Sequence, residues 1–245
     1  MDLVKSLSEQ FPETSKSSIR KWIKHGRVSV KNGKAVLLPK QKDRGNLDIF
    51  YEDEHIVVVN KPEGLLTVAT ARIKDETLHA QVKKYFDRVW PVQRLDRGTS
   101  GVLVFALTEE AKEGLKQQFM KHTIYREYAG IVEGRLEGSG TWECRLKDDP
   151  SYTVRVNASG DLAITHYEAI KHSENHTFMK FILKTGKKNQ IRVQSAHFGH
   201  PILGDRKYGS DKRAKGRLKL HAHKLGFLHP ITKKKLFFIS PNPFL

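Results

Sequence analysis

Cysteine, long apolar runs and acidic residues are all scarce in this sequence. Cys144 is the single cysteine among 245 residues, so the chain cannot form an intramolecular disulfide or a cysteine-based zinc cluster. Apolar runs stay well below the ~18 residues that a membrane-spanning helix requires. The first residues also lack the charged-then-apolar pattern of a secretory signal. From these absences we expect a cytoplasmic protein with no membrane association.

Acidic residues are outnumbered by basic ones. The sequence holds 44 Lys and Arg against 27 Asp and Glu, a formal net charge of +17. Such an excess favours a polyanionic partner, most often a nucleic acid. An acidic membrane surface would also attract cations, but here they are spread along the chain rather than gathered on one amphipathic helix. We therefore expect RNA or DNA as the partner, rather than a merely soluble basic protein.

Glycine patterns that bind free nucleotides are missing as well. The sequence contains neither a Walker-type loop nor the glycine pattern of a dinucleotide-binding fold, so it does not support nucleotide hydrolysis or redox chemistry. Histidine pairs occur at short spacing, His197 with His200 and His221 with His223. No carboxylate or cysteine spacing completes a metal site around them, and we expect no bound metal.

Residues 1–46 have the pattern of a small separate module. Ser17 or Ser18 can cap a helix, whose apolar residues share one face at Ile19, Trp22 and Ile23. The other face of this helix carries the cations Arg20, Lys21, Lys24 and Arg27. This face is either simply solvated or lies along an RNA phosphate backbone. We count these four cations among the expected substrate contacts. Asn32-Gly33 predicts a hairpin turn, and the polar stretch 40–46 reads as a linker.

From residue 48 onward, strand-like runs outnumber helical ones. Alternating or β-branched runs predict strands at 56–59, 102–107, 125–132, 152–156, 164–170, 178–183 and 236–239. Thr108 is placed to cap a helix, with a buried stripe at Ala111, Leu115 and Phe119. A second helix is predicted over 189–198, ended by Gly199. Because strands and helices do not alternate strictly, we predict an α+β domain over 47–245 with a mixed or antiparallel sheet.

The strongest local feature is a carboxylate inside a basic, glycine-containing loop. Arg94-Leu95-Asp96-Arg97-Gly98-Thr99-Ser100-Gly101 comes just before a buried strand. Glycines allow a tight loop and the close approach of a ligand, and neighbouring cations favour an ionised carboxylate. Such a group suits a nucleophile or base that acts on an electron-poor sugar carbon. Judged on these residues alone, a structural ion pair in a turn is the more common explanation.

Two further features have the chemistry to contact RNA. Lys184-Thr185-Gly186-Lys187-Lys188-Asn189-Gln190-Ile191-Arg192 places a glycine and several cations at a helix start, which makes an anion site or a non-specific phosphate contact. Tyr128 follows Arg126-Glu127 on an alternating strand. An aromatic ring there can stack on an extruded base or simply fill the core.

Taken in order, four segments resemble the RluA-type pseudouridine synthases. They cover 51–66, which includes Asn60-Lys61-Pro62, then 94–106, 190–209 and 220–230. The resemblance spans roughly residues 48–244, and four ordered blocks are far more specific than any single motif. In addition, residues 15–28 with Asn32-Gly33-Lys34 resemble an S-four-type RNA-binding domain, a small N-terminal α/β module.

The resemblance implies an enzyme that isomerises uridine to pseudouridine in RNA without a metal or organic cofactor. Asp96 would be the catalytic carboxylate, Tyr128 would stack on the target base, and Arg192 would pair with Asp96 and orient it. The implied fold is a mixed, mainly antiparallel sheet with flanking helices and RNA bound across a central cleft. We expect further substrate contacts from Arg94, Arg97, Thr99, Lys187, Lys188, Gln190 and Leu220.

Departures from the family pattern leave the substrate open. Gln93 stands where the family usually has histidine, and Lys188 and Asn189 stand where arginine and histidine are common. The amides keep hydrogen-bonding capacity but lose a protonatable ring. Ribosomal RNA is favoured because the S-four-type module occurs in members that act on it, and transfer RNA is the other candidate.

Two other functions compete with the synthase. A noncatalytic RNA-binding or ribosome-assembly protein would share the basic surface, and an RNA N-glycosylase would share the single Asp. The retention of Asp, Tyr and Arg together disfavours the first, and the lack of a second carboxylate beside Asp96 disfavours the second. We expect a monomer with no obligate protein partner.

Overall fold

The chain divides into two compact units, Met1–Asn46 and Leu47–Leu245. The computed structural model describes residues 3–10, 12, 14–17, 19, 28–31, 34–37, 47–70, 76–149, 153–209 and 216–244. The four cations predicted on the N-terminal helix, Arg20, Lys21, Lys24 and Arg27, lie outside the described residues, as do the turn at 32–33 and the linker at 40–46. The S-four-type assignment therefore stays a prediction.

The first unit contains one described helix and a hairpin. The helix is α1 (Leu3–Gln10), and the antiparallel strands are β1 (Val28–Lys31) and β2 (Lys34–Leu37), with Val28 opposite Leu37. The Asn-Gly signal predicted this hairpin. It gave no indication of α1, a short helix in which Leu7 is fully buried.

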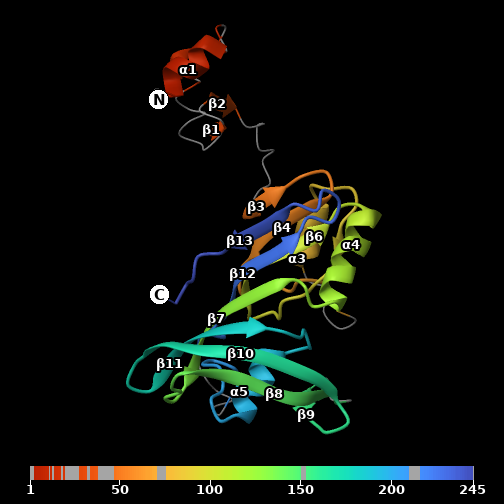
Figure 1. Ribbon diagram of the computed structural model, residues 1–245, viewed down its shortest axis with the longest axis vertical. Helices are drawn as coiled ribbons and strands as arrows, with labels where there is room; N and C mark the ends of the chain where they lie inside the picture. The colour runs from red at the N-terminus through yellow and green to blue at the C-terminus, as the bar shows by residue number, and fades with distance from the viewer. Residues whose placement is uncertain are drawn as a thin grey trace. The chain divides into compact units, whose positions relative to one another are not determined.

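The second unit is built on one eleven-stranded sheet with the order β3-β4-β6-β12-β7-β11-β10-β8-β9, to which β13 adds beside β12 and β5 beside β6 (Figure 1). The strands are β3 (Ile49–Glu52), β4 (Ile56–Lys61), β5 (Trp90–Pro91), β6 (Ser100–Ala106), β7 (Tyr125–Glu133), β8 (Ser139–Asp148), β9 (Val154–Val156), β10 (Asp161–His172), β11 (His176–Leu183), β12 (Leu220–Leu228) and β13 (Lys235–Ile239). Only β6 and β12 pair in parallel among these described strands. The predicted mixed, mainly antiparallel sheet is confirmed.

Three described helices accompany this sheet: α3 (Leu78–Lys83), α4 (Glu109–Met120) and α5 (Gln190–His197). Thr108 caps α4 as predicted, because its hydroxyl accepts a hydrogen bond from the Ala111 amide at 3.2 Å. Gly199 follows α5 with φ +84°, a conformation that glycine adopts without steric cost. None of the described helices is long and apolar enough to cross a bilayer.

Apolar residues cover both faces of the strands at the centre of the sheet. Every residue of β6 is buried. Val57, Val59 and Leu103 belong to one hydrophobic cluster, and Val58 and Val104 belong to another. A strand buried on both faces reads as a continuous apolar run, which is why β4 and β6 were predictable. Their burial also anchors the loop that precedes β6.

The remaining differences from the predicted elements concern boundaries and half-buried strands. Strand β9 spans Val154–Val156 instead of 152–156, and Tyr152 lies outside the described residues. Strand β10 is longer than the predicted 164–170, because exposed polar residues at both ends continue its ladder with β8 and β11. The short elements β3, β5 and α3 were not predicted.

Candidate active site

A cavity of about 70 Å³ lies where the loop before β6, strand β7 and the start of α5 meet. Eight of the predicted site residues line it: Arg94, Asp96, Thr99, Tyr128, Lys187, Gln190, Arg192 and Leu220. The other lining residues are Leu95, Leu183, Asn189 and Ile191. Segments distant in sequence are thus brought to one place.

Hydrogen bonds on both sides of Asp96 fix the loop that carries it. The Thr67 hydroxyl donates to the Leu95 carbonyl at 2.8 Å and accepts from the Leu95 amide at 3.1 Å. The Thr99 amide donates to the Asp96 carbonyl at 3.0 Å, and the Thr99 side chain is buried. The backbone is therefore held in place while the Asp96 carboxylate projects into the cavity.

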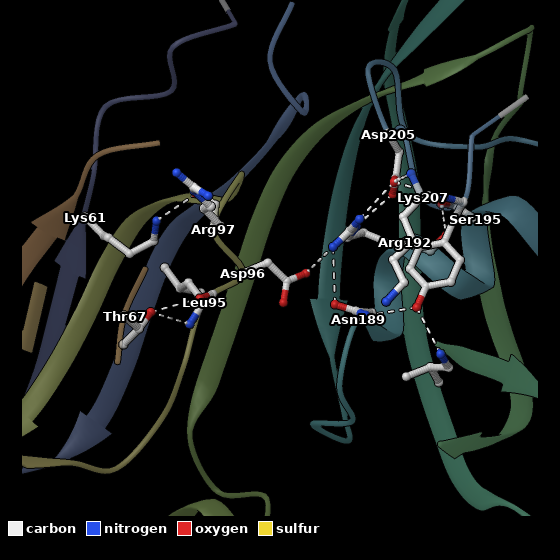
Figure 2. Close-up of polar contacts among 12 residues, drawn as sticks. Lys61, Thr67, Leu95, Asp96, Arg97, Asn189, Arg192, Ser195, Asp205 and Lys207 are labelled. Carbon is white, nitrogen blue, oxygen red and sulfur yellow. Dashed lines mark hydrogen bonds and ion pairs between the residues drawn. The ribbon is translucent and has the colours of Figure 1, made fainter. Parts of the chain in front are cut away.

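The Asp96 carboxylate is paired with Arg192 from helix α5. Arg192 Nη1 donates to Asp96 Oδ2 at 2.8 Å, which is the contact that the family resemblance implies. On the far side, Arg192 Nε and Nη2 donate to the two carboxylate oxygens of Asp205 at 2.7 and 2.8 Å. Figure 2 shows the guanidinium lying between the two carboxylates. Sequence reasoning missed Asp205, although the third matching segment contains it.

Charge and burial act in opposite directions on this arrangement. Burial by itself would lower the pKa of Arg192, but the hydrogen bonds and charges of Asp205 and Asp96 raise it above its ordinary value. For Asp205, burial by itself would raise the pKa, but hydrogen bonds from Arg192 and two backbone amides hold that pKa below its usual range. The Asp205 side chain is fully buried, so this ion pair is shielded from solvent.

Asn189 braces the same guanidinium from a third side. Its Oδ1 accepts from Arg192 Nη1 at 3.2 Å, and its Nδ2 donates to the Tyr208 hydroxyl at 2.9 Å. That hydroxyl in turn accepts from the Val154 amide at 3.0 Å. Asn189 has φ +53°, a left-handed conformation that asparagine tolerates better than most residues. Asn189, which stands where histidine is common in the family, therefore connects Arg192 to Tyr208.

Tyr128 lines the same cavity from strand β7. It lies opposite Phe181 on one neighbouring strand and Ala222 on the other. Burial raises the pKa of Tyr128 to about 12, with Arg126 acting to lower it and Asp96 to raise it. The phenol is therefore neutral at physiological pH, and its ring offers a flat surface beside the carboxylate.

The sequence profile of RNA pseudouridylate synthases matches residues 55–197, a range that includes Asp96, Tyr128 and Arg192. This chain belongs to that family. It is 35% identical to ribosomal large subunit pseudouridine synthase D of Xylella fastidiosa, over 97% of this chain and 84% of that protein. It is 33% identical to the protein of the same name from Escherichia coli K12, over 98% and 87% of the two chains.

A solved structure shares the fold of this synthase. The human RNA pseudouridylate synthase domain containing 1 superposes with a TM-score of 0.70, at 24% sequence identity, over 84% of this chain and 88% of the human chain. The second unit therefore has the pseudouridine synthase fold, with a mixed central sheet and few helices.

Lys61 connects the opening matched segment of the synthase to the loop that carries Asp96. Its side chain is fully buried, and its ammonium donates to the carbonyls of Pro62 at 2.8 Å, Leu65 at 2.7 Å and Arg97 at 3.3 Å. Burial lowers the pKa of Lys61 to about 8, against the opposing attraction of Asp96. Its place in Asn60-Lys61-Pro62 was a signal that sequence reasoning did not use.

Other predicted contacts of the synthase lie around the cavity or support it. Arg97 does not line the cavity, since its Nε donates to the Gly64 carbonyl at 2.9 Å. Lys188 also lies outside the lining and pairs with Asp148 at 3.1 Å. Among the described residues, the cation that pairs with Asp96 is Arg192, as the family resemblance implies.

Gln190 lines the cavity, but its amide is occupied by protein groups. It accepts from the Thr185 hydroxyl at 2.8 Å and the Lys187 amide at 2.9 Å, and donates to Ile164 O at 3.0 Å and Thr165 Oγ1 at 2.9 Å. These four bonds use its hydrogen-bonding groups within the protein. Gln190 therefore supports the loop before α5, and its contact with the substrate stays a prediction.

The histidines of the synthase serve mainly as hydrogen-bonding residues. Within the described part of the chain, no group of three or more His, Cys, Asp or Glu is placed to hold a metal ion. His221 Nδ1 lies 2.8 Å from the Ser100 hydroxyl, and His223 Nδ1 lies 2.7 Å from the Ser240 carbonyl. His200 Nδ1 lies 3.2 Å from the Glu133 carbonyl.

Proposed function

We propose that this synthase isomerises uridine in large-subunit ribosomal RNA, with Asp96 as the catalytic carboxylate. The observation that carries the proposal is the Asp96–Arg192 ion pair in a cavity that Tyr128 also lines. The relatives named above supply the choice of RNA, because both are ribosomal large subunit synthases.

The positions of these side chains support the following reaction. The enzyme flips the target uridine out of its stack, at a cost of a few kcal/mol, and the base stacks on Tyr128. The Asp96 carboxylate either attacks the anomeric carbon or removes the neighbouring ribose proton, and the N-glycosidic bond breaks. The uracil leaves as an anion and turns, and its carbon 5 bonds to the anomeric carbon. In the first route this bond displaces the Asp96 ester, and in the second route Asp96 returns its proton to the ribose. Carbon 5 then loses its proton to solvent, and nitrogen 1 takes up a proton. Arg192 holds Asp96 in place throughout.

The cavity favours isomerisation over glycosidic hydrolysis. A glycosylase needs a group that activates water, commonly a second carboxylate. Among the described residues that line the cavity, Asp96 is the one acid, and the nearby Asp205 is fully buried in its bonds to Arg192. The detached uracil is therefore held beside the sugar without an activated water.

The N-terminal unit, 1–46, serves in this proposal as the S-four-type RNA-binding module. Arg20, Lys21, Lys24 and Arg27 would lie along the phosphate backbone, and Arg94, Thr99, Lys187 and Leu220 would contact the flipped nucleotide. The enzyme would act as a cytoplasmic monomer without a cofactor. Transfer RNA is the alternative substrate.

The decisive experiment measures tritium release from RNA labelled at carbon 5 of uracil. Asp96→Asn should release none above background, while Asp87→Asn, an exposed acid outside the cavity, should match the parent chain. Tritium release by Asp96→Asn at the parental rate would exclude Asp96 as the catalytic group. A parent chain that binds RNA without releasing tritium would instead support the noncatalytic alternative.

The RNA substrate is settled by mapping pseudouridine in a strain that lacks the gene. The proposal predicts a missing site in large-subunit ribosomal RNA and unchanged transfer RNA. A loss confined to transfer RNA would overturn the ribosomal assignment while leaving the enzymatic activity intact.

A further inference from the structure

Buried donors without partners are concentrated next to the cavity residues. Among the described residues, the buried side-chain nitrogens that lack a hydrogen-bond partner belong to Gln93, Arg126 and His221. Gln93 precedes Arg94, Arg126 lies two residues before Tyr128, and His221 follows Leu220. Buried polar groups are nearly always paired in folded proteins, and exceptions often mark function. These donors therefore point toward a polar ligand at the active site.

Arg126 is the charged member of this set. The residue is 7% exposed, and its Nε and Nη2 have no hydrogen-bond partner among the described residues. Its cation lies over the Phe119 ring, with 5.8 Å from Cζ to the ring centroid, a contact that offsets only part of the cost of removing a charge from water. Burial lowers the pKa of Arg126, but an arginine remains cationic at neutral pH. A buried cation of this kind is suited to an anion.

The position of Arg126 connects it to both the cavity and the surface. It shares strand β7 with Tyr128 at a spacing of two residues, so both side chains leave the same side of the strand. Its Nη1 lies directly beneath Gly186, since a Cβ on that glycine would stand 2.4 Å from it. Gly186 is exposed, and the next residue, Lys187, lines the cavity. The Arg126 guanidinium therefore packs directly against the backbone of the loop that borders the cavity.

We propose that Arg126 binds a phosphodiester of the RNA beside the flipped uridine, an inference that rests on the proposed function. A flipped nucleotide keeps a phosphate on each side, so a base on Tyr128 brings one close to the neighbouring Arg126. The planar guanidinium matches phosphate oxygens in a two-pronged contact. The exposed cations Lys184 and Lys188 flank the same loop and draw the backbone toward it.

The first test is the salt dependence of binding to an unmodified in vitro transcript of bacterial large-subunit ribosomal RNA. Loss of one phosphate contact reduces the slope of log affinity against log salt by ~0.7 to 0.9. Arg126→Gln should show that reduction and a roughly tenfold weaker affinity at low salt, whereas Arg126→Lys should keep the slope. Arg135→Gln is the matched control, because Arg135 is exposed and pairs with Glu137. An unchanged slope in Arg126→Gln overturns the proposal.

The second test uses thermal unfolding of the free protein. Arg126→Met removes an unpaired buried charge and should raise the melting temperature, by ~2–4 °C or more, while weakening RNA binding. A residue kept only for packing would give the opposite result, so a lower melting temperature in Arg126→Met counts against the proposal. Failure of the proposed function has a different signature, namely a parent chain that binds the transcript without forming pseudouridine.

Discussion

Asp205 orients the Asp96 carboxylate through Arg192, although Asp205 does not line the cavity. It holds Arg192 through two hydrogen bonds, and Arg192 presents its remaining nitrogen to Asp96. Because the Arg192 guanidinium is planar and makes two hydrogen bonds to Asp205, its orientation toward Asp96 is fixed. Asp205 is therefore a positioning residue, and the orientation of Asp96 depends on it.

Replacing Asp205 with Asn should damage both stability and rate. The change leaves Arg192 partly buried without its main counterion, which costs ~3 kcal/mol of unfolding free energy. A misplaced Arg192 should lower the single-turnover rate on saturating RNA by ~100-fold, with a smaller change in RNA affinity. Urea unfolding and rapid-quench kinetics measure the two effects.

The control for this prediction is Asp161→Asn, which removes an exposed partner of Lys187. It should leave both quantities nearly unchanged, because an exposed pair contributes little. An Asp205→Asn protein that turns over at the parental rate would show that Arg192 needs no such clamp.

Asp96 and Arg192 stand in segments that resemble the family, and Tyr128 stands on an alternating strand, so the sequence singled out three residues that line one cavity. The tasks of Asn189, Gln190 and Asp205 were not predictable. Their side chains are committed through contacts with residues far along the chain, such as Tyr208 and Ile164. A one-dimensional pattern shows that a residue is polar, but it does not show which partner uses its hydrogen bonds.

At the scale of elements, the end of strand β4 is fastened to the loop that carries Asp96. Lys61 closes that strand and donates to carbonyls on both segments. Its pKa of about 8 lies below the 10.5 of an exposed lysine. Between those two pH values the unfolded chain binds the additional proton, so stability rises with pH through this window.

The parent chain should therefore gain about 2 kcal/mol of unfolding free energy between pH ~7.5 and ~9.5 relative to Lys61→Met. The substitution removes the titrating group, so the difference between the two proteins isolates its contribution. Urea unfolding across this range gives the measurement. Parallel pH profiles would show that the Lys61 ammonium is not protonated differently in the two states.

Elements with a continuous apolar run or a clear cap were predictable, and short elements or those with widely spaced buried residues were harder. Strand β6 reads as an unbroken apolar run, and α4 has its cap and stripe in sequence. Strand β8 buries mainly Trp142 and Leu146, with exposed polar residues between them, so its pattern is weak. The helix α3 has only six residues, too few for a clear helical period.

At the scale of the whole molecule, the proposed function divides the task of holding RNA between two units. The second unit has its own hydrophobic clusters and its own eleven-stranded sheet, whereas the net charge of +17 belongs to the full chain. When a catalytic domain is linked to a separate RNA-binding module, the module contributes affinity and the domain contributes the chemistry. RNA affinity and catalytic rate can then be lost independently of each other.

A chain restricted to residues 47–245 should fold and retain the single-turnover rate at saturating RNA within about twofold. Its affinity for large-subunit ribosomal RNA should fall by something on the order of 100-fold, because linked binding is lost. Filter binding and single-turnover assays on the same transcript test this. Equal affinity of the short and full chains would remove the N-terminal unit from RNA recognition.

The position of β12 within the sheet sets when this enzyme becomes active during its own synthesis. The strand runs from Leu220 to Leu228, yet it lies between β6 and β7, which are made much earlier (Figure 1). Asp96 lies in the loop before β6, and Tyr128 lies on β7. Strands β6 and β7 cannot be joined in one sheet until β12, which lies between them, has been made. A nascent chain that ends before β12 therefore contains Asp96, Tyr128 and Arg192 without the strand that joins β6 to β7, and we expect it to modify RNA only once β12 has been made.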